Sequence, residues 1–375
     1  MTQPSSPGIG LAFAVQTAKG VPITSSASFK KVRVNNASLG IQQAVGRFPQ
    51  EVGGTYHPGG EYKMFYAGAG NVNWSPRLAG DIGYLLYALM GSVASSGTSD
   101  AQGVYTTTFQ PAADHCSHPW LSLRRFIPSC TTGDVGGEYM YDAKVSGMAI
   151  SLAAGGPATA DLAFLSINAG TASDASDWDT DMTGAYESTD SVILAPASAK
   201  PVLKAVTGID LGGGVASDYS IPTLALQLGI ANTFSADGIR PELVIGSYQP
   251  DDAVLTGQTM SFQITYKWAN QKLYRDIYNY GHDAYAWSPH ILYAGAEFAL
   301  RSPRLIGTSN VYEEMLVKLT ECSLSCPQGI TLVGGQFLTV NITGTAKAQA
   351  TPAGYGSIVL KNGKAYTDLG VTYSA

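Results

Sequence analysis

The most ligand-rich stretch of the chain is the pentapeptide DHCSH, residues 114–118. With one later cysteine it offers two imidazoles and two thiols, which are side chains that zinc prefers: His115, Cys116, His118 and Cys130. Their spacing matches no strong zinc pattern, and the prolines around the stretch indicate a loop. We therefore expect a surface loop and leave open whether Cys116 and Cys130 form a disulfide.

Two other clusters have suitable side chains at unsuitable spacing. Cys322 and Cys326 lie about 13 Å apart if their segment is a strand, at about 3.3 Å per residue, which is too far for a disulfide. We expect two buried thiols that pack as small apolar groups. Asp177, Asp179 and Asp181 begin like a calcium loop, but the glycine that such a loop needs next is absent. We expect a solvated acidic linker there.

No motif for nucleophilic catalysis, metallohydrolysis, or phosphate or dinucleotide binding occurs in the chain. We therefore assign no catalytic, cofactor-binding or metal-binding residue and expect a protein that is not an enzyme. Only 13% of the 375 residues are charged, and the net charge is -6, which does not suit a general nucleic-acid binder. There is no apolar run long enough to span a bilayer and no basic leader, so cytoplasmic synthesis, reduced cysteines and no membrane partner are expected.

The elements that would position these residues are mostly strands. Apolar and polar residues alternate at 31–34, 104–109, 148–152 and 338–342, and glycine-rich turns separate the alternating segments. This pattern predicts a mainly β chain.

Two short helices interrupt the β pattern. In the first, the apolar residues Ile82, Leu85, Leu86, Leu89, Met90 and Val93 form the stripe of a helix seated on a core, with Asp81 as a possible N-cap and Gly91 as a residue that can end or interrupt it. In the second, the stripe is Leu273, Ile277 and Tyr280, with Asn270 as a possible cap and Gly281 after it.

The elements around the two helices occur in the same order. Each helix follows a Pro-acidic-Val loop and a strand that begins at glycine, and precedes a strand and a long hairpin-like pair. Gly91 and Gly281 are close to half the chain apart. We expect a tandem duplication, with a first fold in residues 1–170, an acidic Ser/Thr/Asp-rich linker in 171–198 and a second fold in 199–375.

At PELVIGSYQPDDAVLTGQTMSFQITYKWANQKLYRDIYN, residues 241–279, the chain resembles the tail tube proteins of long, non-contractile-tailed bacteriophages. GDIGYLLYALMGSV followed by VYTTTFQP is similar to the first helix and strand of that family, and GIGLAFAVQTAKGVPIT resembles its opening, although Gln16, Lys19 and Gly20 depart from its usual residues. The resemblance covers most of residues 8–345.

The resemblance implies two tandem β-sandwich or barrel-like tube folds, each with a short helix on the outer side of its sandwich. Six such folds make a ring, so three chains would complete one pseudo-hexameric ring, and rings would stack head to tail around a lumen for DNA. The implied partners are other copies of the chain, the tape-measure protein, the tail terminator and the tail-tip proteins. DNA would pass without specific binding, in a virion tail assembled in the host bacterial cytoplasm.

Other interpretations remain open at this point. Only one of the two folds could be a tube fold, in which case six chains would form a ring. A carbohydrate-binding or adhesin-like β-sandwich module would stay monomeric or form a small closed oligomer. An enzyme that uses the cluster around His115 would need bound zinc, or an activity that is lost in His115→Ala.

Overall fold

The computed structural model of the protein describes residues 10–49, 60–95, 99–100, 102–114, 117–127, 136–172, 175, 178, 189–204, 218–235, 242–243, 245, 247, 250–268, 271–279, 290–331, 338–348, 352–366 and 368–369. The first half is mostly strands around one helix: β1 (Gly10–Val15), β2 (Lys30–Val32), β3 (Val34–Ala37), β4 (Gly40–Arg47), β5 (Glu61–Trp74), α1 (Ile82–Met90), β6 (Gly91–Ser95), β7 (Tyr105–Pro111), β8 (Leu121–Ile127), β9 (Gly136–Ala153) and β10 (Thr159–Ala172). Short 3-10 turns lie at Ser26–Ser28 and Thr189–Ser191.

The second half repeats this composition. Its elements are β11 (Val202–Leu203), β12 (Tyr219–Ser220), β13 (Thr223–Phe234), β14 (Glu242–Leu243), β15 (Pro250–Asp252), β16 (Leu255–Lys267), α3 (Gln271–Asn279), β17 (Tyr293–Leu305), β18 (Tyr312–Ser325), β19 (Ile330–Thr331), β20 (Thr339–Ala346), α4 (Pro352–Tyr355) and β21 (Gly356–Asn362). The prediction of a mainly β chain is confirmed, and every described strand pair is antiparallel.

The two halves have the same order of neighbouring strands. In the first half the order is β2, β1, β8, β9, β10, β5, β4. In the second half it is β12, β11, β17, β18, β20, β16, β13, and the matching strands also follow one another in the same order along the chain. The register repeats as well. β10 pairs with β5 over seven consecutive residue pairs, and β20 pairs with β16 over seven.

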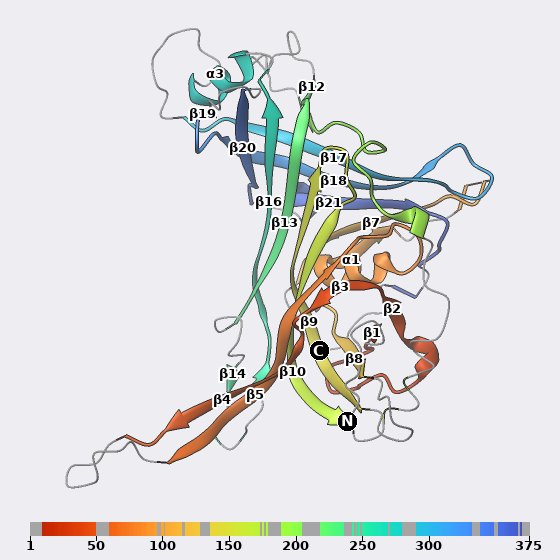
Figure 1. Ribbon diagram of the computed structural model, residues 1–375, viewed down its shortest axis with the longest axis vertical. Coiled ribbons are helices and arrows are strands. Elements are labelled where there is room, and N and C mark those ends of the chain that lie inside the picture. The colour runs from red at the N-terminus through yellow and green to blue at the C-terminus, as the bar shows by residue number, and fades with distance from the viewer. Residues whose placement is uncertain are drawn as a thin grey trace.

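The two halves are joined through their sheets. β9 of the first half pairs with β13 of the second over seven residue pairs, from Gly147 opposite Ala231 to Ala153 opposite Ala225. A second link is made by β21, which pairs with β7. In Figure 1, β9, β10, β13 and β16 run along the long axis of the molecule, whereas β17, β18, β21 and β7 run across it.

The main core lies between these strand groups and contains residues of both halves. Leu226, Ile264 and Ile342 are buried on the neighbouring strands β13, β16 and β20. Phe262 of β16 packs on Phe298 of β17 with ring centroids 4.9 Å apart. Because one contiguous apolar cluster extends through both halves, neither half encloses its core alone.

Helix α1 is more deeply buried than the predicted apolar stripe implies. All nine of its residues are buried, because the C-terminal part of the chain covers the side that faces away from the sheets. Tyr366 is so close to Gly83 that a β-carbon there would lie 2.3 Å from the phenol ring. Asp81 makes no side-chain cap bond and instead pairs with Lys364.

Gly91 ends the helix and does not merely interrupt it, with the left-handed φ of 95° that glycine adopts most easily. The prediction that Val93 belongs to the helical stripe is wrong, because the chain continues from Gly91 as strand β6.

Helix α3 is less enclosed than α1. Leu273 and Ile277 are buried as predicted, but Tyr278 keeps 37% of its surface exposed. The expected cap Asn270, the stripe residue Tyr280 and Gly281 lie outside the described residues. In the described part of the chain, we find no helix with the length and apolar character needed to cross a membrane.

Part of the segment between the halves is structured. β10 continues to Ala172, past the predicted start of the linker at residue 171. Further on, the Leu194 amide donates to the Arg301 carbonyl and the Ala199 amide to the Ala299 carbonyl, each at 3.0 Å. Residues 194–199 therefore pack against β17. The rest of the boundary between the two predicted folds stays a prediction.

Candidate assembly interface

The predicted metal-ligand cluster is only partly described. His115, Cys116 and Cys130 lie outside the described residues. The prediction of a surface loop is wrong for His118, which is fully buried. Its imidazole packs against the C-terminal end of α1. The described residues contain no group of three or more His, Cys, Asp or Glu side chains that could hold a metal ion.

His118 belongs to a buried polar network. Its Nε2 lies 3.3 Å from the Leu89 carbonyl oxygen, near the end of α1. The same oxygen accepts hydrogen bonds from Asn232 Nδ2 at 2.9 Å and from Gln258 Nε2 at 3.0 Å. Asn232 also donates to the Val145 carbonyl at 2.9 Å. These bonds satisfy a helix-end carbonyl and tie α1 to β9, β13 and β16, across both halves of the chain.

The charge state of His118 follows from its surroundings. Burial, followed by the nearby Lys144 ammonium, lowers the pKa of His118 to about 3. The imidazole is therefore neutral near pH 7. Sequence reasoning singled out His118 but missed Asn232. The period-two pattern of the sequence could have indicated that Asn232 is buried, because it places Asn232 on the buried face of β13 between Ile230 and Phe234.

Both described cysteines are buried free thiols, as predicted. The Cys322 thiol donates to the Ala294 carbonyl at 2.8 Å. Burial raises the pKa of Cys322 and of Cys326 to about 12, so both stay protonated and poorly nucleophilic. The aspartates at positions 177, 179 and 181 lie outside the described residues.

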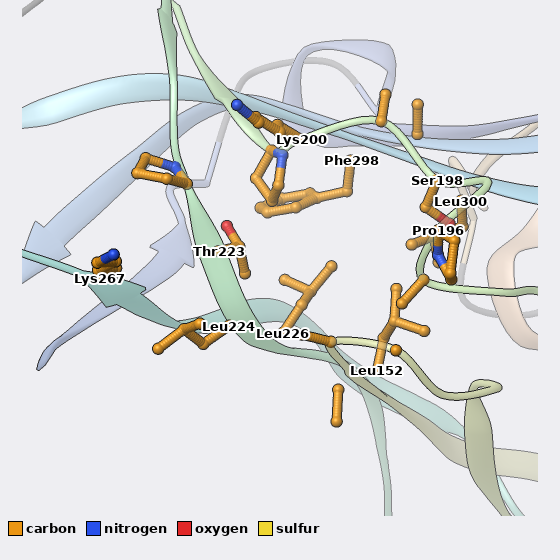
Figure 2. A pocket seen from close by; sticks show the side chains of 18 residues that line it. Leu152, Pro196, Ser198, Lys200, Thr223, Leu224, Leu226, Lys267, Phe298 and Leu300 are labelled. Carbon is orange, nitrogen blue, oxygen red and sulfur yellow. The ribbon is translucent and has the colours of Figure 1, made fainter. Parts of the chain in front are cut away.

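A cleft of about 400 Å³ lies where the two halves meet. Figure 2 shows Leu152, Leu224 and Leu226 on one side and Phe298 on the other, with Lys200 and Lys267 farther out. The described residues that line the cleft include no carboxylate, imidazole or thiol. Its chemistry is therefore that of an apolar surface with two cations nearby.

Several described strands pair with one neighbour only, and two of them, β4 and β19, have edges that could extend the sheet. Among the described residues, β4 pairs only with β5, and β19 pairs only with β20. Ile330 of β19 is 37% exposed. An open strand edge presents unpaired backbone donors and acceptors, which readily pair with another chain.

The hairpin formed by β4 and β5 projects from the body of the molecule (Figure 1). Four large apolar side chains along it are exposed: Val45, Phe48, Tyr62 and Met64. The Phe48 and Tyr62 rings contact each other, with centroids 4.9 Å apart. A projecting arm with exposed apolar residues is typical of a surface that contacts another protein.

Comparison with known proteins identifies a family with which this chain shares most of its sequence. The family model described as "Phage tail tube protein" matches residues 49–346, which include most strands of both halves, both long helices and the junction of β9 with β13. No curated protein matches the chain. The family is one of bacteriophage structural proteins and virion components. The chain belongs to the phage tail tube protein family.

Proposed function

We propose that three copies of this chain form one ring of the tail tube, and that each copy supplies two of six similar folds. Rings then stack head to tail around a lumen through which DNA passes during ejection. Stacking of this kind is a heterologous contact, which produces an open filament. The observation that carries the proposal is the repeated strand order of the two halves, together with the β9–β13 junction that joins them.

The junction supplies a template for the contact between chains. Within the chain, β9 of the first fold pairs with β13, the first strand of the hairpin of the second fold. The counterpart of β13 in the first fold is β4, whose outer edge is open among the described residues. β20 pairs with β18 over one part of its length and with β19 over the other, so β9 corresponds to β18 followed by β19. The part of β9 that meets β13 corresponds to β19. Repeating the junction between copies therefore pairs the β4 edge of one chain with the segment at β19 of the next.

The registers identify the residues that would face each other. Gly68 and Ser261 are counterparts, so their partners Ile41 on β4 and Gly229 on β13 are counterparts too. By the same reasoning, Ala149 on β9 and Ile330 on β19 are counterparts. Gly229 faces Ala149 within the chain. Ile41 of one chain therefore faces Ile330 of the next, and the contact covers an exposed isoleucine.

A cysteine pair tests this contact and counts the chains. Oxidised assemblies of the double variant Ile41→Cys/Ile330→Cys should give a covalent ladder that ends at three chains, because opposite residues of paired strands are close enough for a disulfide. Each single variant, and the pair Ile41→Cys/Ile291→Cys with an exposed isoleucine outside the contact, should give no such ladder. A ladder that ends at six chains would assign a six-chain ring, and no ladder would exclude this strand pairing.

We further propose that the tail is long and non-contractile and that it is assembled in the host bacterial cytoplasm. Membership of the tail tube family supports only the place of the chain in a phage tail. Its partners there are the tape-measure protein during length control, and the tail terminator and tail-tip proteins at the two ends. Copurification of these proteins with tubes isolated from virions is the direct check.

A further inference from the structure

A small cavity lies beside the first turn of helix α1 and has a volume of about 20 Å³. Strand β2 lines it with Lys31, and the end of β5 lines it with Trp74. Because about 10–15 Å³ of such space is enough for one water molecule, the cavity holds one particle of that size and excludes phosphate and other polyatomic groups. We call it the α1 cavity.

The polar side chains around the α1 cavity are hydrogen-bond donors, with one exception. Donors that cannot accept are supplied by Lys31, Arg33, Trp74 and Arg77. The exception among the described lining residues is the carboxylate of Asp81. The rest of the lining is apolar and consists of Phe13, Val32, Ile82 and Leu85.

Positive charge is held out of water at the α1 cavity. Lys31 Nζ and Arg77 Nε are both buried atoms. Three lining cations against one carboxylate give the lining a net charge of +2, and that carboxylate is itself engaged by Lys364. The start of α1 adds the positive end of the helix dipole. An anion in the cavity would offset the cost of burying this positive charge.

The Trp74 indole supplies a direct binding group. Its side chain is only 4% exposed, and its Nε1 is buried without a hydrogen-bond partner among the residues that the structure describes. A buried donor in a native protein normally has an acceptor. The Gly83 amide donates to the Tyr366 hydroxyl at 3.3 Å, and the Tyr84 amide to the Asp81 carbonyl at 3.1 Å, so neither amide is available to a ligand. The indole N–H is available.

A water molecule and an anion place different demands on such a lining. Water donates two hydrogen bonds and needs acceptors, of which the described lining side chains supply only the Asp81 carboxylate. A monoatomic anion only accepts, and every other polar side chain of the lining donates. We propose that the α1 cavity binds one monoatomic anion of about the size of chloride, held by the Trp74 N–H and the surrounding cations.

The bound anion joins parts of the chain that are distant in sequence. Strand β2 contributes Lys31, and α1 contributes its first turn. Lys364 reaches the same turn through Asp81, from the C-terminal part of the chain. The anion therefore stabilises the folded chain. This inference does not rest on the proposed tube function, since the site lies within one chain.

Salt-dependent unfolding tests the anion. The unfolding midpoint of the dissociated chain is measured in sodium chloride and in sodium gluconate at equal ionic strength, which keeps general charge screening the same. Arg33→Gln, at an exposed lining residue, should need several-fold more chloride than the parental chain for the same stabilisation, because a ligand of the folded state stabilises it according to its affinity. Arg47→Gln, on the exposed arm, is the matched control and should respond as the parental chain does. General effects of each salt cancel in this comparison, so an identical difference between the salts in all three proteins would overturn the inference.

Bromide locates the site directly, because it replaces chloride and its anomalous scattering identifies it in a crystal. Crystals of the parental chain grown in bromide should show a peak in the α1 cavity, within hydrogen-bond distance of Trp74 Nε1. Trp74→Phe keeps an aromatic ring but removes the N–H, so the peak should be weakened or lost. If this variant does not fold, the parental crystals decide. Bromide peaks on exposed surfaces alone would show an adventitious ion only and would overturn the inference, whether or not the chain forms tubes.

Discussion

The hydroxyl of Tyr366 is the point where the end of the chain meets the first helix. It accepts from the Gly83 amide at 3.3 Å and from Asn362 Nδ2 at 2.9 Å, and donates to the Gly80 carbonyl. Nearby, the Tyr84 hydroxyl donates to Asp368 at 2.8 Å. Residues far apart in the sequence thus satisfy one another's polar groups in a buried place, where an unpaired group is costly.

Replacing Tyr366 with phenylalanine should lower the free energy of unfolding by about 1–3 kcal/mol, since the substitution leaves buried partners without a hydrogen bond. Chemical denaturation monitored by circular dichroism measures the change. Tyr62→Phe, on the exposed arm, is the matched control and should have no measurable effect. Equal stability of the two variants would show that the Tyr366 hydroxyl contributes nothing to folding.

His118 should make the protein less stable in mild acid. Its pKa is about 3 when folded, against about 6.5 in an unfolded chain. Between these values the unfolded state binds more protons, so stability is lost as the pH falls below about 6.5, by at most about 1.4 kcal/mol per pH unit. His118→Gln should flatten this dependence in denaturation series between neutral and mildly acidic pH. The same substitution at exposed His290 is the control, and an unchanged slope in His118→Gln would exclude this role.

At the scale of elements, period-two patterns predicted the main strands because alternation depends only on neighbouring residues. The two helices were predicted for a similar reason. The full burial of α1 was not predictable in this way, because the cover over Gly83 is Tyr366, a contact between distant parts of the chain. The pairing of β9 with β13 was not predictable either, because it also joins distant parts of the chain. Its register depends on which strands meet, and local patterns do not encode that.

The β9–β13 pairing and the shared core predict that the two halves unfold together. Differential scanning calorimetry of the dissociated chain should show a single transition whose calorimetric and van't Hoff enthalpies agree. Two separated transitions would show that each half encloses a core of its own, contrary to the contiguous cluster in the structure.

At the scale of the whole molecule, the repeated order of loop, strand and helix in the sequence predicted a duplication, and the strand order of the two halves repeats in the same way. The sequence could not indicate that Ile41 and Gly229 are counterparts, because that match comes from strand registers. This match arises from the arrangement of the strands in space, which local sequence patterns do not encode.

Electron cryomicroscopy of assembled tubes, with the chains in each ring counted, tests the central claim most directly. The account predicts three chains per ring, six similar folds around the lumen, and a sheet that continues from β4 of one chain to the β19 segment of the next. Six chains per ring, or rings in which only one half of each chain surrounds the lumen, would contradict it.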